Sequence, residues 1–452
     1  MRDFTTGTIA RQLLLFSIPM LIGNLFQQMY SIVDMIVVGR YISGSALASV
    51  GVSMNMIMFI VATLIGLTTG ASVVISQFFG AKQYDRLKKT VSVSIITLFG
   101  ISVLLTVLGI SLSPLLLRLL GTGEEIFDDA LIYMRIVMAG MVFPVFYNMY
   151  TAYMRALGDS KRPLYFLIFT TILNIGLNLF FVLVLDMGVA GVAMATIISQ
   201  MIAAVLCFVY AARSMPILYV KKLEFDFELF KLIFKYGTPA ALQLSLTSFA
   251  QLTITRLINS FGAAAMAGIT TAARIDQFAI MPVQNLSMAM STFVAQNMGA
   301  GIEERARKGL HIATIYMLIC SFFMSLVLVL FRYPLISLFL SQGDPNAGEI
   351  LRIGSEYLNI IVLFYFLFAF LFAFNGFFRG AGDAVIAMVF PVFSLTVRAL
   401  SAYGLVGFFD MGPEALAWSI AIGWGLSSLA SFVYYKKRLW AGKIVVKIKE
   451  ED

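Results

Sequence analysis

Apolar segments long enough to cross a lipid bilayer follow one another along almost the whole sequence. Because a helix rises about 1.5 Å per residue, about 20 apolar residues span a hydrocarbon core about 30 Å thick. Of the 452 residues, 60% are hydrophobic and 12% are charged, which is more apolar surface than a soluble core of this length can hold. The sequence predicts an all-α membrane protein with twelve transmembrane helices, near residues 12–38, 47–78, 91–116, 130–156, 163–185, 189–211, 233–261, 264–297, 310–331, 351–378, 384–409 and 413–435.

Basic residues are distributed unevenly between the segments that connect these predicted helices. If the N-terminus is cytoplasmic, 24 of the 32 lysines and arginines lie on cytoplasmic segments, and the residues on the outer segments are Arg40, Arg118, Arg332 and Arg352. Membrane proteins retain positive charge on the cytoplasmic side, so both termini are predicted to be cytoplasmic. The net charge of +8 then reflects topology, and no nucleic-acid partner is expected.

The sequence contains an internal repeat. The segment Gln-Phe-Phe-Gly-Ala at 77–81 returns as Gln-Asn-Met-Gly-Ala at 296–300, which is 219 residues later. Similarly, Arg-Ala-Leu-Gly-Asp at 155–159 returns as Arg-Gly-Ala-Gly-Asp at 379–383, which is 224 residues later. Because each copy holds six helices, an even number, both copies have the same orientation, as in the parallel repeats of transporters. The repeat predicts two six-helix lobes, with an N-lobe at 1–211, a cytoplasmic linker at 212–235 and a C-lobe at 236–452 that ends in a basic tail.

Motifs near the first predicted helix resemble those of a known transporter family. Residues 27–34 are Gln-Gln-Met-Tyr-Ser-Ile-Val-Asp, followed by Val-Gly-Arg at 38–40, and Gly-Val-Ala-Gly occurs at 188–191. Together with the repeated Gln-x-x-Gly-Ala turns, these motifs resemble the multidrug and toxic compound extrusion (MATE) family, in its prokaryotic DinF-like branch. The resemblance implies an antiporter in a bacterial or archaeal cell membrane. Such an antiporter exports amphipathic or cationic drugs and toxins by alternating access, in exchange for inward H+ or Na+ and without a cofactor.

The same resemblance implies a cation-coupling site. Members of this branch use an aspartate in the first helix, which Asp34 matches, and a threonine in the sixth helix, which Thr196 matches. Their fifth-helix pattern Leu-Asn-x-x-Leu-Asp reads Leu-Asn-Ile-Gly-Leu-Asn here, so Asn174 matches and Asn178 departs from the pattern. Counting from the outer helix ends places Asp34, Asn178 and Thr196 at a similar depth, roughly 7 to 11 Å below the surface. Together they could carry a proton or ligate Na+.

Only one of the two sequence copies has this carboxylate. The position that corresponds to Asp34 in the second copy is Thr253, or Ile254 if the register slips by one residue. Unpaired charges are costly inside a membrane, so an acid that is kept in one copy alone favours a functional role for Asp34. For Asn174, Asn178 and Thr196, ordinary hydrogen bonding between helices is an equally good interpretation.

Embedded arginines support an alternative function. Arg256, Arg274 and Arg398 fall inside predicted C-lobe helices, and buried guanidinium groups often recognise phosphate. The alternative is a flippase for a lipid-linked polyprenyl-phosphate precursor. Asp276 completes this predicted C-lobe polar cluster, and we expect it to pair with Arg398 or Arg256. Such a pair would neutralise the arginine within the lobe, which favours the exporter over the flippase.

The remaining polar residues do not suggest an enzyme. Cys207 and Cys320 lie in apolar helices, and the single histidine, His311, lies near a predicted membrane interface, so no catalytic or resident metal centre is predicted. The expected partners are small-molecule substrates and membrane lipid, with Na+ as a possible ion at Asp34, and the protein is expected to be a monomer.

Overall fold

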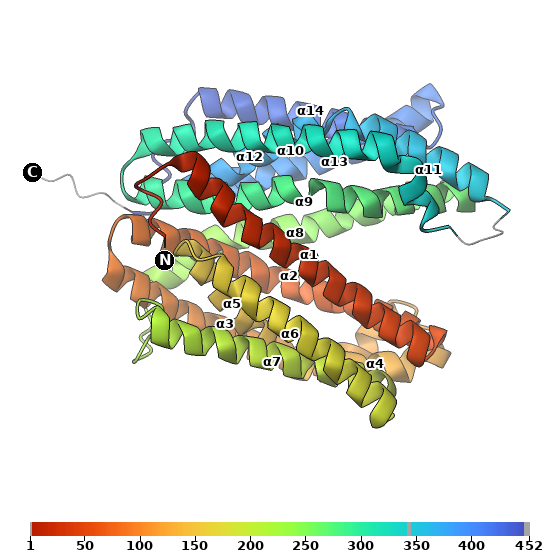
Figure 1. Cartoon of the computed structure of the whole chain (residues 1–452), viewed down its shortest axis with the longest axis horizontal. Coiled ribbons are helices and arrows are strands. Elements are labelled where there is room, and N and C mark those ends of the chain that lie inside the picture. The colour runs from red at the N-terminus through yellow and green to blue at the C-terminus, as the bar shows by residue number, and fades with distance from the viewer. Residues whose placement is uncertain (1, 341–344, 447–452) are drawn as a thin grey trace, which may run out of the picture. The chain divides into compact units, whose positions relative to one another are not determined.

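The computed structural model describes residues 2–340 and 345–446, and the regular elements in these ranges are helices (Figure 1). They are α1 (Ile9–Tyr41), α2 (Gly44–Gly80), α3 (Tyr84–Leu119), α4 (Glu124–Ala139), α5 (Val142–Ala156), α6 (Lys161–Leu179), the π-helical turn η1 (Phe180–Val184), α7 (Gly188–Ser214), α8 (Phe227–Ser260), α9 (Ala263–Gly299), α10 (Glu303–Ser337), α11 (Ala347–Val362), α12 (Tyr365–Ala381), α13 (Ala384–Phe409) and α14 (Ala415–Lys436). The end of the predicted basic tail, 447–452, lies outside the described residues.

These helices account for the predicted membrane segments. In the described part of the chain, nine helices are long and apolar enough to cross a membrane. The pairs α4–α5 and α11–α12 pass the same test together, and they are bent by 50° and 54°. The 34-residue α8 is not among them, and it carries a polar stripe of Gln243, Thr247 and Gln251. With α8 included, the described helices follow the predicted order of twelve segments, and the prediction of an all-helical membrane fold is confirmed.

Repeated sequences form the same local structure in both halves of the chain. Gly158 and Gly382 end α5 and α12 in the left-handed region, at φ of +79° and +93°, which glycine adopts without strain. The next residue in each copy is an aspartate that accepts a hydrogen bond from a tyrosine 51 residues later. Tyr210 donates to Asp159 over 3.2 Å, and Tyr434 donates to Asp383 over 2.7 Å.

By contacts, the chain divides into two compact units. Unit 1 contains Ile18–Ala241, and unit 2 contains Phe4–Ser17 together with the chain from Leu242 onward. The beginning of α1 therefore belongs to unit 2, and the beginning of α8 belongs to unit 1. Each boundary falls within three residues of a proline inside the helix, Pro19 in α1 and Pro239 in α8. The lobe boundaries derived from the sequence stay a prediction.

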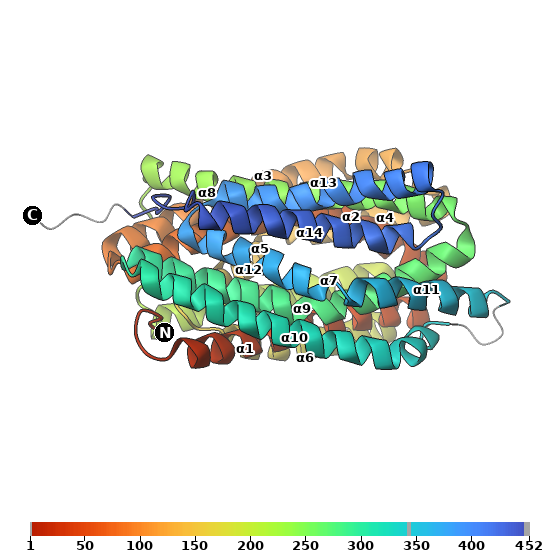
Figure 2. The ribbon, with the colours of Figure 1, turned by 90° about the horizontal axis from the view of Figure 1, so that it is seen from above.

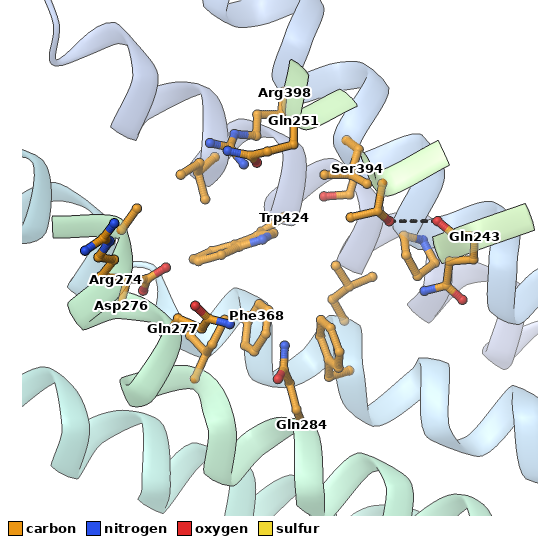
Figure 3. Close-up of a pocket in the computed structure, with 18 of the residues that line it drawn as sticks. Gln243, Gln251, Arg274, Asp276, Gln277, Gln284, Phe368, Ser394, Arg398 and Trp424 are labelled. Atoms are coloured by element: carbon orange, nitrogen blue, oxygen red, sulfur yellow. Dashed lines mark hydrogen bonds between the residues drawn. The ribbon is translucent and has the colours of Figure 1, made fainter. Parts of the chain in front are cut away.

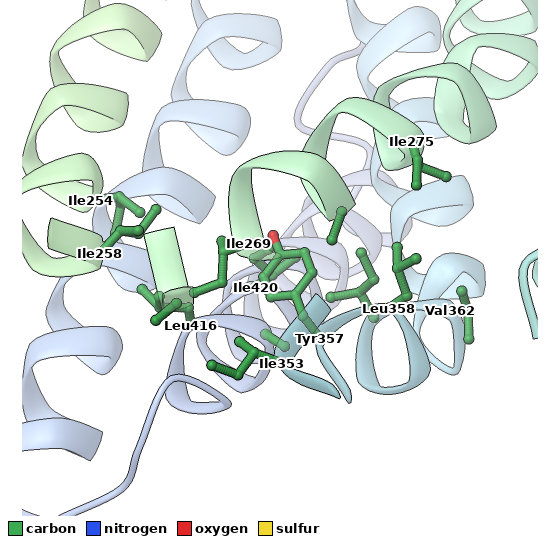
Figure 4. Close-up of a cluster of buried hydrophobic side chains, with 14 of the residues drawn as sticks. Ile254, Ile258, Ile269, Ile275, Ile353, Tyr357, Leu358, Val362, Leu416 and Ile420 are labelled. Carbon is green, nitrogen blue, oxygen red and sulfur yellow. The ribbon is translucent and has the colours of Figure 1, made fainter. Parts of the chain in front are cut away.

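Unit 2 is built around α9, which packs on α10, α11 and α12 (Figure 2). Its core holds buried apolar side chains from α8, α9, α11 and α14, including Ile254, Ile269, Leu358 and Leu416 (Figure 4). These residues recur at helical spacing on the inward faces of their helices, which is the pattern of a close-packed helical core.

Unit 1 has a corresponding centre in α2, which packs on α3, α4 and α5. The first part of α8 approaches α2 so closely that a Cβ on Gly70 would lie 2.2 Å from the backbone nitrogen of Gly237. A Cβ on Gly66 would lie 2.3 Å from the nitrogen of Ala241. Small residues permit such backbone contact between membrane helices, where dispersion forces rather than water exclusion hold the helices together.

The segment before α1 is anchored within unit 2 by the repeated turn at 296–300. The Phe4 nitrogen donates to Gln296 Oε1 over 2.9 Å, and the Phe4 carbonyl accepts from Asn297 and Arg305 over 3.1 and 3.0 Å. The Phe4 ring is 1% exposed and packs against the rings of Phe16 and Phe293, with centroids 5.1 and 6.0 Å away. Backbone hydrogen bonds and a buried ring thus hold this segment in place.

Replacing Phe4 by alanine should destabilise the protein. Because truncating a buried phenylalanine removes its packing and leaves a cavity, we expect a loss of about 3 kcal/mol in the free energy of unfolding. Thermal unfolding in detergent measures the effect, with Phe322→Ala as the matched control because Phe322 is 74% exposed. Equal unfolding temperatures for the two variants contradict the anchoring role of Phe4.

Candidate functional site

The structure brings Asp34, Asn174 and Asn178 together inside unit 1. Asp34, on α1, is 2% exposed. The side-chain nitrogen of Asn178, on α6, donates to Asp34 Oδ1 over 2.5 Å and to Asn174 Oδ1 over 3.0 Å. The amide group of Asn178 therefore links the Asp34 carboxylate to Asn174 and ties α1 to α6.

Helical geometry explains why the two asparagines lie side by side. Asn174 and Asn178 are four residues apart, so they project from one face of α6. Two residues after Asn178 the α-helix gives way to the π-helical turn η1, and such turns are frequent at functional sites. Apolar side chains surround the site, including Val38, Val182 and Val192. These apolar neighbours exclude water and strengthen every electrostatic interaction of Asp34.

Several polar atoms around Asp34 lack partners. Asp34 Oδ2, Asn178 Oδ1, Asn174 Nδ2 and the hydroxyls of Thr196 and Tyr30 are buried without a hydrogen bond of normal geometry. Each buried polar atom without a partner costs about 1–3 kcal/mol, so such atoms are rare unless they bind water, a proton or an ion. Polar atoms without hydrogen-bond partners are therefore concentrated beside one buried carboxylate.

Thr196 and two tyrosines complete the surroundings of Asp34. Thr196, on α7, lies near Tyr30, and neither hydroxyl forms a hydrogen bond with a described residue. Tyr30 and Tyr133 both interact electrostatically with Asp34. Sequence reasoning missed both tyrosines. Tyr30 could have been found, because it precedes Asp34 by four residues on α1, whereas Tyr133 lies on the distant α4.

The donor set limits what this site can hold. Within residues 2–340 and 345–446, no cluster of three or more histidine, cysteine or acidic side chains could bind a metal. A sodium ion at Asp34 would therefore rely on neutral oxygens, and those available without partners are Asn178 Oδ1, Thr196 Oγ1 and the Tyr30 hydroxyl. A proton needs only Asp34 Oδ2.

The predicted C-lobe polar cluster is arranged differently from the prediction. Asp276 accepts a hydrogen bond from the Tyr365 hydroxyl over 2.5 Å and forms no ion pair with Arg398 or Arg256 in the described chain. The predicted pairing is therefore wrong: Tyr365, at the bend between α11 and α12, donates to one oxygen of Asp276, and no arginine comes within ion-pair distance of it among the described residues. Arg274, Asp276 and Arg398 line one cavity in unit 2, whereas Arg256 is exposed and does not line it.

Comparisons with known proteins identify the class. A family model described as MatE matches residues 19–180 and 239–403. A "Probable multidrug resistance protein YpnP" of Bacillus subtilis is 30% identical over 440 residues, which cover 97% of each chain. A "Probable multidrug resistance protein NorM" of Thermotoga maritima is 27% identical and covers 89% of this chain and 87% of its own. The fold and these matches define a membrane transporter and not an enzyme.

Solved structures share the fold of this chain. A structure titled "Crystal structure of MATE in complex with MaL6" superposes with a TM-score of 0.90 at 23% identity, and it covers 97% of this chain and 98% of its own. An "Outward-facing conformation of a multidrug resistance MATE family transporter of the MOP superfamily" gives a TM-score of 0.89 at 23% identity and covers 97% of each chain. The family model and the 30% identical relative show that the chain belongs to the MATE family.

The hydrogen bond between Asn178 and Asp34 should appear as a coupling energy. A hydrogen bond to a charged group contributes about 1.5–3 kcal/mol, so Asn178→Ala should destabilise the native protein by that amount. In an Asp34→Leu background the same change should cost about 1 kcal/mol or less, because the charged acceptor is gone. Denaturant unfolding of the two single variants and the double variant measures the coupling. Additive effects contradict the interaction.

Proposed function

We propose that this protein is a secondary active antiporter that exports amphipathic or cationic drugs and toxins in exchange for inward H+ or Na+. Asp34 binds the coupling cation, and the protein alternates between outward-open and inward-open states. One observation carries the proposal, namely a buried carboxylate in unit 1 whose second oxygen has no partner. The relatives named as multidrug resistance proteins support the choice of drugs as substrates. The flippase alternative gains no support from these relatives.

Electrostatics supply the driving force for cation binding at Asp34. An ionised carboxylate in apolar surroundings costs several kilocalories per mole, and the single amide donor of Asn178 offsets only part of that cost. Binding a proton or Na+ removes the net charge, so the occupied and empty sites favour different packing around Asp34. A ligand that binds two states unequally shifts the population between them, which is the basis of coupled transport.

Because Asp34 lies on α1, a change in the packing around its side chain acts directly on this helix. Pro19 lies fifteen residues before Asp34 inside α1, and a proline there removes one backbone hydrogen bond and permits a bend. The second copy of the repeat has a corresponding proline, Pro239 in α8, so Pro19 also belongs to the architecture that the two copies share. We propose that neutralising Asp34 lets the outer part of α1 repack within unit 1 and that this repacking discharges the drug outward.

The placement in the membrane is also part of the proposal. The positive-inside distribution of basic residues supports cytoplasmic termini and a location in a prokaryotic cytoplasmic membrane. The proposed protein acts as a monomer surrounded by lipid, and no cofactor takes part. Release of the cation into the cytoplasm resets the transporter.

Efflux from proteoliposomes tests the role of Asp34. Vesicles that contain the native protein should export a cationic dye when a proton or a sodium gradient is imposed. Asp34→Asn should slow efflux by about tenfold or more, because the amide cannot gain and lose the cation. The matched control is Asp186→Asn, which changes an exposed aspartate at a turn with φ of +50°, a conformation that asparagine tolerates.

Two outcomes of this experiment decide separate points. If Asp34→Asn exports dye as fast as the native protein, Asp34 does not couple transport. Imposing the proton gradient in sodium-free buffer, and the sodium gradient at equal pH, identifies which cation drives the native protein.

A further inference from the structure

A cavity of about 560 Å³ lies within unit 2, and its size falls in the range of small-molecule sites (Figure 3). The walls come from α8, α9, α11, α12, α13 and α14. None of the residues of the Asp34 site lines it. The cavity is therefore a separate site from the one that we assign to the coupling cation.

Polar side chains face this cavity along two helices. Gln243, Thr247 and Gln251 recur every four residues on α8, and Thr270, Arg274, Gln277 and Gln284 form a stripe on α9. Spacings of three, four and seven residues keep these side chains on one helical face. Polar groups at membrane depth are costly unless they face a cavity or a ligand, so this arrangement indicates a polar binding chamber.

The charges that line the cavity are unbalanced. Arg274 and Arg398 stand against the single carboxylate of Asp276, and Asp276 already accepts the Tyr365 hydroxyl. Neither arginine forms an ion pair within the described residues, and the Nε of Arg398 is buried without a hydrogen-bond partner. Asp276 lies within electrostatic range of Arg398 but beyond ion-pair distance. One positive charge and several guanidinium donors therefore remain for an anion.

An aromatic surface lies between these charges. The indole ring of Trp424 projects into the cavity between the arginines and the glutamines of α9 (Figure 3). Phe368 packs against it with ring centroids 5.0 Å apart, so the indole is supported from one side. An aromatic face held in this way stacks on flat rings.

The internal repeat shows how the two units differ at corresponding positions. The offset of 224 residues carries Asn174 onto Arg398 and Gln200 onto Trp424, and the offset of 219 carries Asp34 onto Thr253. Where unit 1 places an amide beside a carboxylate, unit 2 has a guanidinium. The cavity therefore has the opposite charge preference to the Asp34 site and does not duplicate it.

From these features we infer that the cavity in unit 2 binds an organic anion with a flat aromatic ring. The guanidinium groups of Arg398 and Arg274 bind its carboxylate, sulfonate or phosphate, the ring stacks on Trp424, and the glutamines bind its polar substituents. The anionic group is the shared chemistry of two sources, a dissolved aromatic acid and a lipid headgroup. The aromatic surface and the limited volume favour the dissolved acid.

Binding of a matched pair of probes tests this inference on the purified full-length protein. Naphthalene-1-carboxylate and naphthalene-1-methanol share a ring and differ in charge, and calorimetry gives both affinities. The acid should bind about tenfold or more tightly than the alcohol. Arg398→Gln should remove this advantage and leave the alcohol unaffected, which also shows that the variant is folded. Arg256→Gln is the matched control, because this arginine does not line the cavity, and it should leave both affinities unchanged.

Three outcomes overturn the inference. The first is equal affinity of the native protein for the acid and the alcohol, and the second is full affinity of Arg398→Gln for the acid. The third is displacement of the acid by phosphatidylglycerol but not by phosphatidylcholine in nanodiscs, which assigns the cavity to a lipid headgroup. Because binding at equilibrium needs no ion gradient, Asp34→Asn should leave the affinity for the acid unchanged. Failure of cation-coupled efflux is thereby distinguishable from failure of this inference.

Discussion

A single amide group joins α1 to α6 in unit 1, across 144 residues of sequence, and the arrangement of the site depends on it. Asn178 gives one hydrogen to the Asp34 carboxylate and the other to Asn174. In apolar surroundings a hydrogen bond to a charged acceptor is strong, but here it reaches only one of the two carboxylate oxygens. The same contact that positions Asp34 therefore leaves half of the carboxylate available to a cation.

Duplication has kept the scaffold of the two halves and changed the interior. The aspartates after the glycine turns, Asp159 and Asp383, hold tyrosines at the same interval, and the two bent helix pairs have similar angles. Polar side chains in the interior have diverged, with Asn174 in one copy and Arg398 at the corresponding position of the other. Turns and bends determine how the helices pack, so they tolerate little change. A residue that faces a cavity can change its charge without disturbing the packing.

Helix positions and the repeat could be predicted from the sequence because both depend on local patterns. Length and hydropathy locate the spans, and the helical period places Asn174 and Asn178 on one face. Contacts made by tertiary packing leave no periodic pattern in the sequence. Three features depend on how distant helices meet. They are the approach of Tyr133 to Asp34, the hydrogen bond from Tyr365 to Asp276 and the clustering of Phe4–Ser17 with unit 2. The predicted ion pair of Asp276 failed for this reason, since the distance between its carboxylate and the arginines is set by how the helices pack.

The anchor of the N-terminal segment has a practical consequence for work on this transporter. The carbonyls of Phe4, Thr6 and Gly7 all accept hydrogen bonds from Arg305, so the backbone of the leading residues holds a guanidinium at the beginning of α10. Trimming these residues would remove three hydrogen-bond acceptors of Arg305 and leave the place of an aromatic ring empty. Purification handles and fluorescent fusions therefore belong after the last helix, where they leave this junction intact.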